Sequence, residues 1–215
     1  MSKKTVKEES IIFKIITLGN SGVGKTSIIR RFIYDNYTED TMTTIGVSMS
    51  YKDITLSNGK IIKLKLIDTA GQEKYMALAK SYYKNADGVF FIFSFDDKNS
   101  VESIKIWVNE FNENNKNIGD YLIPQYLIGN KSDININERE VKDDLIEKFR
   151  SESKIEHYET TSAKDNVNIN KIFQEISEMI YKNYEKIIGK EQKKIAIEKY
   201  KPESKNRCGN CFSDL

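Results

Sequence analysis

A phosphate-binding loop is predicted near the amino terminus by the run Gly19-Asn20-Ser21-Gly22-Val23-Gly24-Lys25-Thr26. A short apolar, β-branched segment, 11–18, precedes the loop and a helix-like segment, 27–33, follows it. Glycines let backbone N–H groups and the positive end of a helix approach phosphate oxygens closely. Lys25 would place a positive charge on the β- and γ-phosphates, and Thr26 would offer a hydroxyl to Mg²⁺. The expected phosphate-binding residues are Ser21, Gly22, Val23, Gly24, Lys25, Thr26 and Ser27.

A second polar cluster, Asp-Thr-Ala-Gly-Gln-Glu at 68–73, directly follows another predicted strand. Ligands of α/β proteins bind at the carboxyl edge of the sheet, so this cluster should face the phosphate loop. Asp68 could hold Mg²⁺ through water, and Gly71 would let a backbone N–H approach the γ-phosphate. Gln72 is the candidate catalytic residue, since its amide could orient an attacking water. Alone, the cluster would also suit an ordinary turn; the phosphate loop favours the site.

A third cluster, Asn-Lys-Ser-Asp at 130–133, also follows an apolar strand and predicts recognition of guanine. The Asp133 carboxylate can accept hydrogen bonds from the N1–H and the exocyclic amine of guanine, whereas adenine would leave it unpaired. The segment 162–164 would close the same pocket, with the Ala163 N–H reaching guanine O6 and two lysine stems flanking the ring. The residues expected around the base are Asn130, Lys131, Asp133, Ser162, Ala163 and Lys164.

The segments between these clusters predict an α/β fold. Alternating runs at 49–56 and 61–67 flank Asn58-Gly59, which is typical of a hairpin, and continuous apolar runs at 88–95 and 121–128 are typical of central strands. A strand is also expected at 155–160. Helices are expected from the phosphate loop to 35–36, at 100–114 with Ser100 as N-cap, at 138–150 and at 169–188. We therefore expect a mostly parallel six-stranded sheet with one antiparallel strand and helices on both faces.

The bulk composition narrows the class of protein. The 215 residues carry 34 basic and 32 acidic side chains, a net charge of +2, which argues against binding nucleic acid by general electrostatics. No apolar run reaches the length of a membrane span and no signal-peptide core follows the start, so a cytosolic protein is expected. We expect an N-terminal flexible arm at 1–9, one domain at 10–188 and a flexible tail at 189–215.

Together and in this order, the three clusters and Ser-Ala-Lys at 162–164 resemble the Ras superfamily of small GTPases, over about residues 10–186. The segments 44–47 (Thr-Ile-Gly-Val) and 81–88 resemble the Rab family of vesicle-traffic regulators. The resemblance implies a P-loop small GTPase fold that binds GTP and GDP with Mg²⁺. It also implies that Thr44 binds Mg²⁺ and the γ-phosphate, so that Thr26, Thr44 and Asp68 hold the metal, and that Tyr37 packs against the guanine edge.

The resemblance further implies a slow GTPase that an activating protein accelerates, with an exchange factor, a GDP-dissociation inhibitor and effectors as other partners of a monomer. The expected effector surface consists of Ile45, Met49, Ile67 and Tyr82. Two of these depart from the Rab pattern, which usually has Trp where Ile67 stands and Phe where Met49 stands. The alternative is that Met49 and Ile67 are ordinary sheet residues facing a helix. A Ras-like signalling GTPase, an ATP kinase with a phosphate loop and a nucleotide-binding scaffold with negligible hydrolysis are the rival functions.

The lysine-rich tail ends with the two cysteines of the chain, Cys208 and Cys211. Basic residues beside terminal cysteines suit prenyl anchoring to an anionic membrane leaflet. The end is not a C-a-a-X box, because Cys211 stands one position too early, and it lacks the cysteine spacing that Rabs commonly show. Double prenylation is therefore a hypothesis, with inert thiols as the alternative. It would place the protein in the cytosol and on the cytoplasmic face of an intracellular membrane.

Overall fold

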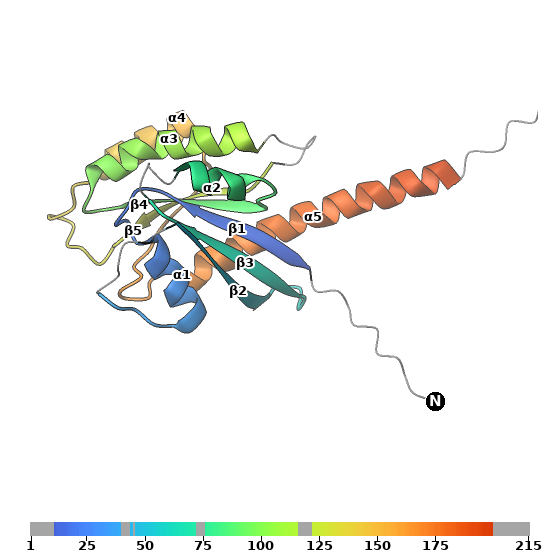
Figure 1. Cartoon of the computed structure of the whole chain (residues 1–215), viewed down its shortest axis with the longest axis horizontal. Coiled ribbons are helices and arrows are strands. Elements are labelled where there is room, and N and C mark those ends of the chain that lie inside the picture. The colour runs from blue at the N-terminus through green and yellow to red at the C-terminus, as the bar shows by residue number, and fades with distance from the viewer. Residues whose placement is uncertain (1–10, 40–43, 45, 72–75, 116–121, 200–215) are drawn as a thin grey trace, which may run out of the picture. The chain divides into compact units, whose positions relative to one another are not determined.

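The computed structural model of the chain describes residues 11–39, 44, 46–71, 76–115 and 122–199 (Figure 1). The chain divides into two compact units, Met1–Tyr181 and Lys182–Leu215. The first unit holds the sheet, and the described part of the second is the end of the last helix. None of the helices among the described residues combines the length and apolar character that crossing a bilayer requires.

Six strands form one sheet in the order β2-β3-β1-β4-β5-β6. The strands β2 and β3 pair antiparallel through the Asn58-Gly59 turn, and every other neighbouring pair is parallel, which confirms the predicted sheet. The parallel strands bring their carboxyl ends to one edge, where the phosphate loop follows β1. The strand bounds are β1 Ile12–Leu18, β2 Val47–Thr55, β3 Ile61–Thr69, β4 Gly88–Ser94, β5 Gln125–Asn130 and β6 His157–Thr160.

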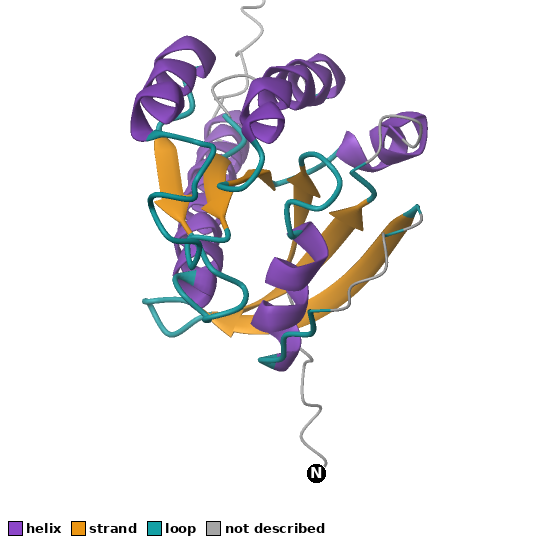
Figure 2. Ribbon diagram, turned by 90° about the vertical axis from the view of Figure 1, so that its left-hand side faces the viewer, coloured by secondary structure: helices purple, strands orange, loops and turns teal. Residues whose placement is uncertain are grey.

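Helices cover both faces of the sheet, as predicted (Figure 2). Alternate residues of β4 show the two sides, because Phe91 packs edge-on against Phe111 of α3 and Phe90 packs edge-on against Phe173 of α5. On the α5 side, Phe173 also stacks on Phe32 of α1 at 3.8 Å between ring centroids. The helix bounds are α1 Lys25–Tyr34, α2 Met76–Tyr83, α3 Lys98–Asn114, α4 Asp143–Ser153 and α5 Ile169–Lys199.

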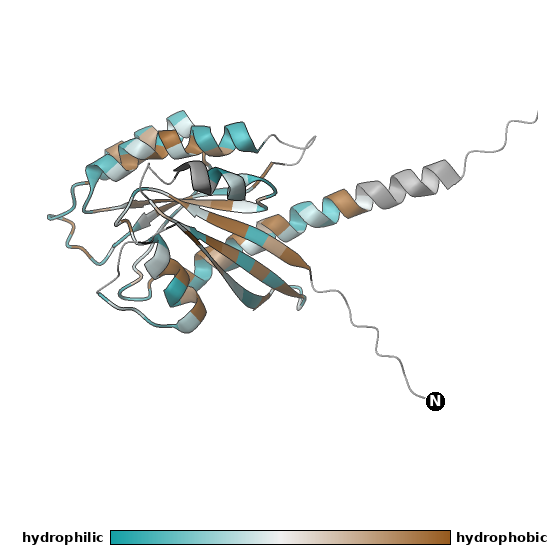
Figure 3. Ribbon diagram, in the orientation of Figure 1, coloured by the Kyte–Doolittle hydropathy of each residue, from teal (hydrophilic) through white to brown (hydrophobic). Residues whose placement is uncertain are grey.

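The core follows the hydrophobic pattern of the strands. All seven residues of β4 are buried, as expected for a central strand covered on both faces. Hydrophobic and hydrophilic residues alternate along the hairpin strands (Figure 3), and in β3 the residues Ile62, Leu64 and Leu66 are buried. Each of these aromatic pairs between β4 and a helix adds about 1 kcal/mol beyond the burial of its surface.

Several predicted helix ends were wrong. The helix α3 begins at Lys98, because Asp97 rather than Ser100 is its N-cap and accepts a hydrogen bond of 3.0 Å from the Asn99 N–H. The helix α4 begins at Asp143 instead of 138, because the preceding Val141 is buried and its N–H bonds the Phe95 carbonyl. The helix α5 continues past 188 to Lys199, since 190–199 consists mainly of the good helix formers Lys, Glu, Gln and Ala and contains no proline.

Two strand starts and one helix also differ from the prediction. The strand β5 begins at Gln125 instead of 121, after Pro124, which has no N–H to donate to the ladder. The strand β6 begins at His157 instead of 155, since only the last four residues of the predicted segment 155–160 pair with β5. The helix α2 had no counterpart in the sequence prediction. The single histidine of the chain, His157, is exposed.

Candidate functional site

One cavity of about 250 Å³ lies at the carboxyl edge of the sheet and brings the sequence clusters together. All the expected nucleotide-contact residues line it except Val23 and Ser162, which are buried and bond the lining residues Asn130 and Asp133. Glu39 and Thr69 line it as well, and sequence reasoning missed both. The lining residues are Ser21, Gly22, Gly24, Lys25, Thr26, Ser27, Tyr37, Glu39, Thr44, Thr69, Gly71, Asn130, Lys131, Asp133, Ala163 and Lys164.

The amino-terminal end of α1 opens toward this cavity. Gly24 is the N-cap of the helix, its backbone is left-handed at φ 94°, and the first turn of α1 contains no acidic residue. A side chain at Gly24 would also meet the Asn130 amide, because a Cβ atom would lie 2.2 Å from Asn130 Nδ2. The first N–H groups of α1 therefore have no carboxylate or side-chain cap from α1 itself, and this arrangement suits an anionic ligand.

The Lys25 ammonium lies buried at the base of the phosphate loop. Its Nζ donates to the carbonyls of Gly19 and Asn20, each at 2.8 Å, so the loop closes around its own cation. Burial lowers the pKa of Lys25 from 10.5 to about 8, and the nearby Asp68 carboxylate opposes this shift. An anion placed in the cavity would favour the charged form of this lysine.

A cluster of oxygen atoms lies beside the phosphate loop. Thr26 Oγ1 is 2.7 Å from Asp68 Oδ2 and 2.7 Å from Thr44 Oγ1. Asp68 is 3% exposed, and its other oxygen, Oδ1, is buried and has no hydrogen-bond partner among the described residues. Burial raises the pKa of this carboxyl, while the Thr26 hydrogen bond and the Lys25 charge lower it.

This donor set fits Mg²⁺. The ion prefers hard oxygen ligands and is held by one or two carboxylates together with the phosphates of a ligand. In the described part of the chain, no group of three or more His, Cys, Asp or Glu side chains that could hold a metal occurs. The Thr44 hydroxyl belongs to this donor set through its contact with Thr26.

At the other end of the cavity, Asp133 is held by a hydroxyl. Ser162 Oγ donates to Asp133 Oδ1 at 2.6 Å and accepts a hydrogen bond from the Asp165 N–H at 2.9 Å. Since Ser162 is fully buried, its contribution is to fix the carboxylate from behind. The Asn130 side chain joins the two halves of the site, because its Nδ2 donates to the Val23 carbonyl at 2.8 Å and its Oδ1 accepts from Thr161 Oγ1 at 3.1 Å.

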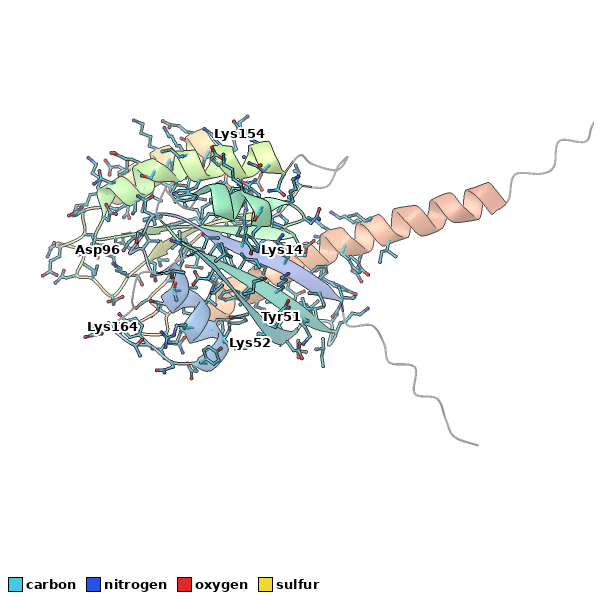
Figure 4. All side chains as sticks on the ribbon, in the orientation of Figure 1. Lys14, Tyr51, Lys52, Asp96, Lys154 and Lys164 are labelled. Carbon is cyan, nitrogen blue, oxygen red and sulfur yellow. The ribbon has the colours of Figure 1, made fainter. Side chains whose placement is uncertain are left out.

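Both lysines of the predicted base site carry an acidic partner. Lys131 Nζ lies 2.8 Å from Asp96 Oδ2, and Lys164 Nζ lies 3.3 Å from Glu39 Oε1. Burial alone would raise the pKa of Asp96, but hydrogen bonds from Lys131 and Ser94 outweigh it and lower that pKa. Figure 4 labels Asp96 and Lys164 at the same end of the molecule. These ion pairs hold the ammonium groups beside Asp96 and Glu39. The aliphatic stems of the two lysines are then available to cover a flat ring.

The expected effector surface is only partly exposed. Met49 on β2 is 48% exposed, whereas Ile67, its partner in the β2–β3 register, is fully buried. The prediction that Ile67 lies exposed was wrong, because Ile67 belongs to the hydrophobic cluster that also contains Ile16 and Tyr83. Tyr82 is partly buried against that same cluster. The candidate catalytic Gln72, the effector residue Ile45 and the cysteines Cys208 and Cys211 lie outside the described residues.

Sequence reasoning missed the side chains that support the cavity from other elements. Asn20 of the phosphate loop is bonded by Trp107, which lies 87 positions away in the chain, and Arg31 bonds the Ala163 carbonyl across 132 positions. Trp107 is itself buried. No local motif marks such pairs, because only the folded chain brings the partners together.

Comparison with known proteins agrees with this geometry. The model of the Ras family matches residues 14–182. The chain is 35% identical to the GTP-binding protein YPT1 of Saccharomyces cerevisiae over 77% of each chain. It is 36% identical to the Ras-related protein Rab-11A of Dictyostelium discoideum, over 84% of this chain and 81% of that protein. It is also 34% identical to the Ras-related protein Rab-13 of Rattus norvegicus, over 77% and 78% of the two chains.

The family match covers most of the chain, and the similar proteins are Rab and Ypt proteins that align with it over more than three quarters of their own length. The sheet, the phosphate loop and the order of the site clusters are those that the resemblance implied. The chain therefore belongs to the Ras family of small GTPases, and within that family it is a Rab-type GTPase of vesicle traffic.

Proposed function

We propose that the cavity binds GTP and GDP together with Mg²⁺, with the phosphates on the loop 19–26 and the guanine against Asp133. The observation that carries this proposal is that one cavity is lined by both the buried Lys25 and Asp133, with the Thr26–Asp68–Thr44 oxygen cluster at its phosphate end. Few other ligands need a loop that binds an anion, a cluster of oxygen ligands for a hard metal ion beside it, and a carboxylate acceptor at the far end of the same cavity.

At the phosphate end, the proposed role of the protein is to bind the phosphates by electrostatic interactions. The Lys25 ammonium would exchange its loop carbonyls for phosphate oxygens, while the amides of Ser21 to Ser27 would donate to the phosphates. Mg²⁺, when bound, neutralises charge that develops on the β- and γ-phosphate oxygens. Thr26 and Thr44 would hold the ion by their hydroxyls, and Asp68, whose Oδ1 lacks a partner among the described residues, would hold it through water.

At the base end, recognition would rest on fixed polar groups. Asp133, oriented by Ser162, would accept the N1–H and the amine of guanine, and the Ala163 N–H would donate to O6. The stems of Lys131 and Lys164 would cover the two faces of the ring, and Tyr37 would close its edge. Adenine would leave the carboxylate unpaired, so adenosine nucleotides should bind far more weakly.

Hydrolysis is proposed to proceed by in-line attack of water, which Gln72 orients, on the γ-phosphate. Among the described residues that line the cavity, the cationic side chains are Lys25, Lys131 and Lys164, and none is an arginine. We therefore expect a slow intrinsic rate, which an activating protein would raise about 10³- to 10⁵-fold by supplying an arginine. Ser21 is small enough to leave room for that side chain.

The switch would work through Thr44 and the segment around Gln72. GTP would order both, which would create a surface that includes Ile45, Met49 and Tyr82, and hydrolysis would release them. An exchange factor and a GDP-dissociation inhibitor would act on the monomer. Prenylation of Cys208 and Cys211, supported by the lysine-rich tail, would attach the protein to the cytoplasmic face of an intracellular membrane.

The test is an equilibrium titration of the purified full chain with fluorescent GTP, GDP and ATP, with Mg²⁺ and with a chelator. We expect tight binding of both guanosine nucleotides, weak binding of ATP and a loss of affinity when Mg²⁺ is removed. A single-turnover measurement with GTP should then show slow release of phosphate. Equal affinity for GTP and ATP would overturn the assignment of the base site.

A further inference from the structure

Arg31 joins two segments that lie far apart in the sequence. It is in the last turn of α1, and its side chain is 14% exposed. Its Nε donates to the Ala163 carbonyl at 2.8 Å, and its Nη2 donates to the Lys164 carbonyl at 2.8 Å. The same guanidinium therefore bonds two successive carbonyls of the loop that closes the base end of the cavity.

A guanidinium is suited to this geometry because its five N–H donors lie in one rigid plane. Two parallel bonds to neighbouring carbonyls fix the orientation of the loop as well as its distance from α1. A lysine at this position would offer a single nitrogen on a flexible stem and could not bond both carbonyls in the same way.

The third bond of Arg31 reaches the start of the segment that leads to Thr44. Its Nη1 donates to the Asp35 carbonyl at 3.0 Å, and its Cζ lies 5.9 Å from the centre of the Tyr37 ring. Asp35 is also bonded from the other side, since Asn166 Nδ2 donates to Asp35 Oδ1 at 3.0 Å. The end of α1, the segment with Tyr37 and the loop after β6 therefore meet at one guanidinium.

Arg31 is not among the described residues that line the cavity, although Tyr37, Ala163 and Lys164 are. We propose that Arg31 is a positioning residue that holds this loop and the Tyr37 ring around the base and thereby slows the release of nucleotide. This inference rests on the proposed binding of guanine nucleotides. Loss of Arg31 frees the Ala163–Lys164 backbone to move away from the base, while Asp133 keeps its bond to Ser162.

Two consequences distinguish an Arg31 that positions the loop from an Arg31 that contacts the nucleotide directly. The rate of dissociation rises while the rate of association stays the same, because the charged groups that line the cavity are unchanged. The preference for guanine over hypoxanthine also stays the same, since Asp133 alone is proposed to read the exocyclic amine. Both nucleotides are then released faster by the same factor.

The test measures dissociation of fluorescent GDP and IDP from the full chain and from three variants. Arg31→Ala and Arg31→Lys remove the paired bonds, and Arg30→Ala is the matched control, because Arg30 is on the same helix and makes none of these three bonds. We expect release about tenfold faster from both Arg31 variants, the effect of losing one hydrogen bond of ordinary strength. Arg30→Ala should stay close to the original rate, and methylguanidinium below denaturing concentration should slow release from Arg31→Ala.

Release at the original rate from both Arg31 variants would overturn the inference, as would an equal acceleration by Arg30→Ala. A change in the ratio of GDP to IDP release would assign Arg31 to the base edge instead. Faster release that methylguanidinium does not slow would indicate a loss of fold stability and would also contradict positioning. If the unaltered chain binds no guanosine nucleotide, the proposed function itself fails, and this outcome is distinct from the others.

Discussion

Trp107 Nε1 donates a hydrogen bond of 3.1 Å to Asn20 Oδ1, so α3 holds the second residue of the phosphate loop. The other end of the same amide is also used, because Asn20 Nδ2 donates to Ser103 Oγ at 3.1 Å. The backbone of Asn20 in turn packs against Gly71, where an added Cβ would lie 2.3 Å from the Asn20 carbonyl. Asn20 is thus fixed by α3 through its side chain, while its backbone lies against Gly71 of the cluster 68–73.

Replacing Trp107 by Phe tests this link. Most of the apolar burial is kept, but Asn20 Oδ1 loses its donor, so we expect the free energy of unfolding to fall by about 1–3 kcal/mol. The affinity for GDP should fall with it. Urea denaturation checks the first result, with Ile106→Ala on the same helix as control, since Ile106 is 55% exposed. Equal stability of Trp107→Phe and the original chain would contradict a role for the indole N–H.

Gly24→Ala tests the contact between the phosphate loop and Asn130. Gly59→Ala is a matched control, because both glycines have a left-handed backbone, at φ 94° and 81°, but only Gly24 has a neighbour where the Cβ would stand. We expect Gly59→Ala to cost about 1 kcal/mol from backbone strain alone, and Gly24→Ala to cost about 3 kcal/mol or more. Thermal denaturation of both variants distinguishes them. Similar losses would mean that Asn130 moves aside without cost.

Asp133→Asn tests recognition of the base. The amide cannot accept both N–H groups of guanine, so affinity for GDP should fall by about 10⁴-fold, while xanthosine diphosphate, which has an oxygen in place of the amine, should gain. Competition binding measures both effects. Asp165→Asn serves as control, because Asp165 is exposed on the loop after β6 and bonds Ser162 through its backbone N–H. Unchanged preference for guanosine would remove Asp133 from the site.

Gln72→Leu tests the proposed catalytic residue. Leucine cannot orient a water molecule, so the variant should bind GTP as the original chain does but lose hydrolysis stimulated by an activating protein. Release of phosphate under single-turnover conditions gives the rate, and fluorescent GTP gives the affinity. Stimulated turnover at the original rate would overturn the assignment.

Mass spectrometry of the C-terminal peptide tests whether Cys208 and Cys211 are prenylated. Protein isolated from its native cells should have a C-terminal peptide heavier by one or two prenyl groups, and Cys208→Ser combined with Cys211→Ser should move the protein from the membrane fraction to the soluble one. Single substitutions would show which thiol is modified. An unmodified peptide from the original chain would remove the anchoring hypothesis.

The parts of the molecule that depend on local spacing could be predicted from the sequence. The Asn58-Gly59 turn was predicted because few other residues suit it, and in the structure Gly59 has φ 81° while Leu56 N–H bonds the Lys60 carbonyl at 2.8 Å. The phosphate loop and the base cluster were predicted for the same reason, since each places its polar groups within a few positions.

What could not be predicted depends on partners supplied by the fold. Ser100 has the residue type of an N-cap, but its hydroxyl is engaged elsewhere, accepting from the Ser94 N–H at 3.0 Å, and Asp97 caps the helix instead. Ile67 ends a segment, 61–67, whose alternating pattern is typical of a half-exposed strand, yet Ile67 lies completely buried in the hydrophobic cluster. Arg31 looked like any basic residue on a helix until Ala163 and Lys164 were placed beside it.

The Asn130 amide has a consequence for nucleotide exchange. Its nitrogen donates to the carbonyl of Val23 in the phosphate loop, and its oxygen accepts from Thr161 Oγ1, next to the segment 162–164. Because one rigid, planar group spans both ends, strain applied to either end is transmitted to the other. If the cavity binds a nucleotide as proposed, a protein that displaces the phosphate loop would therefore also loosen the contacts with the base, without touching them.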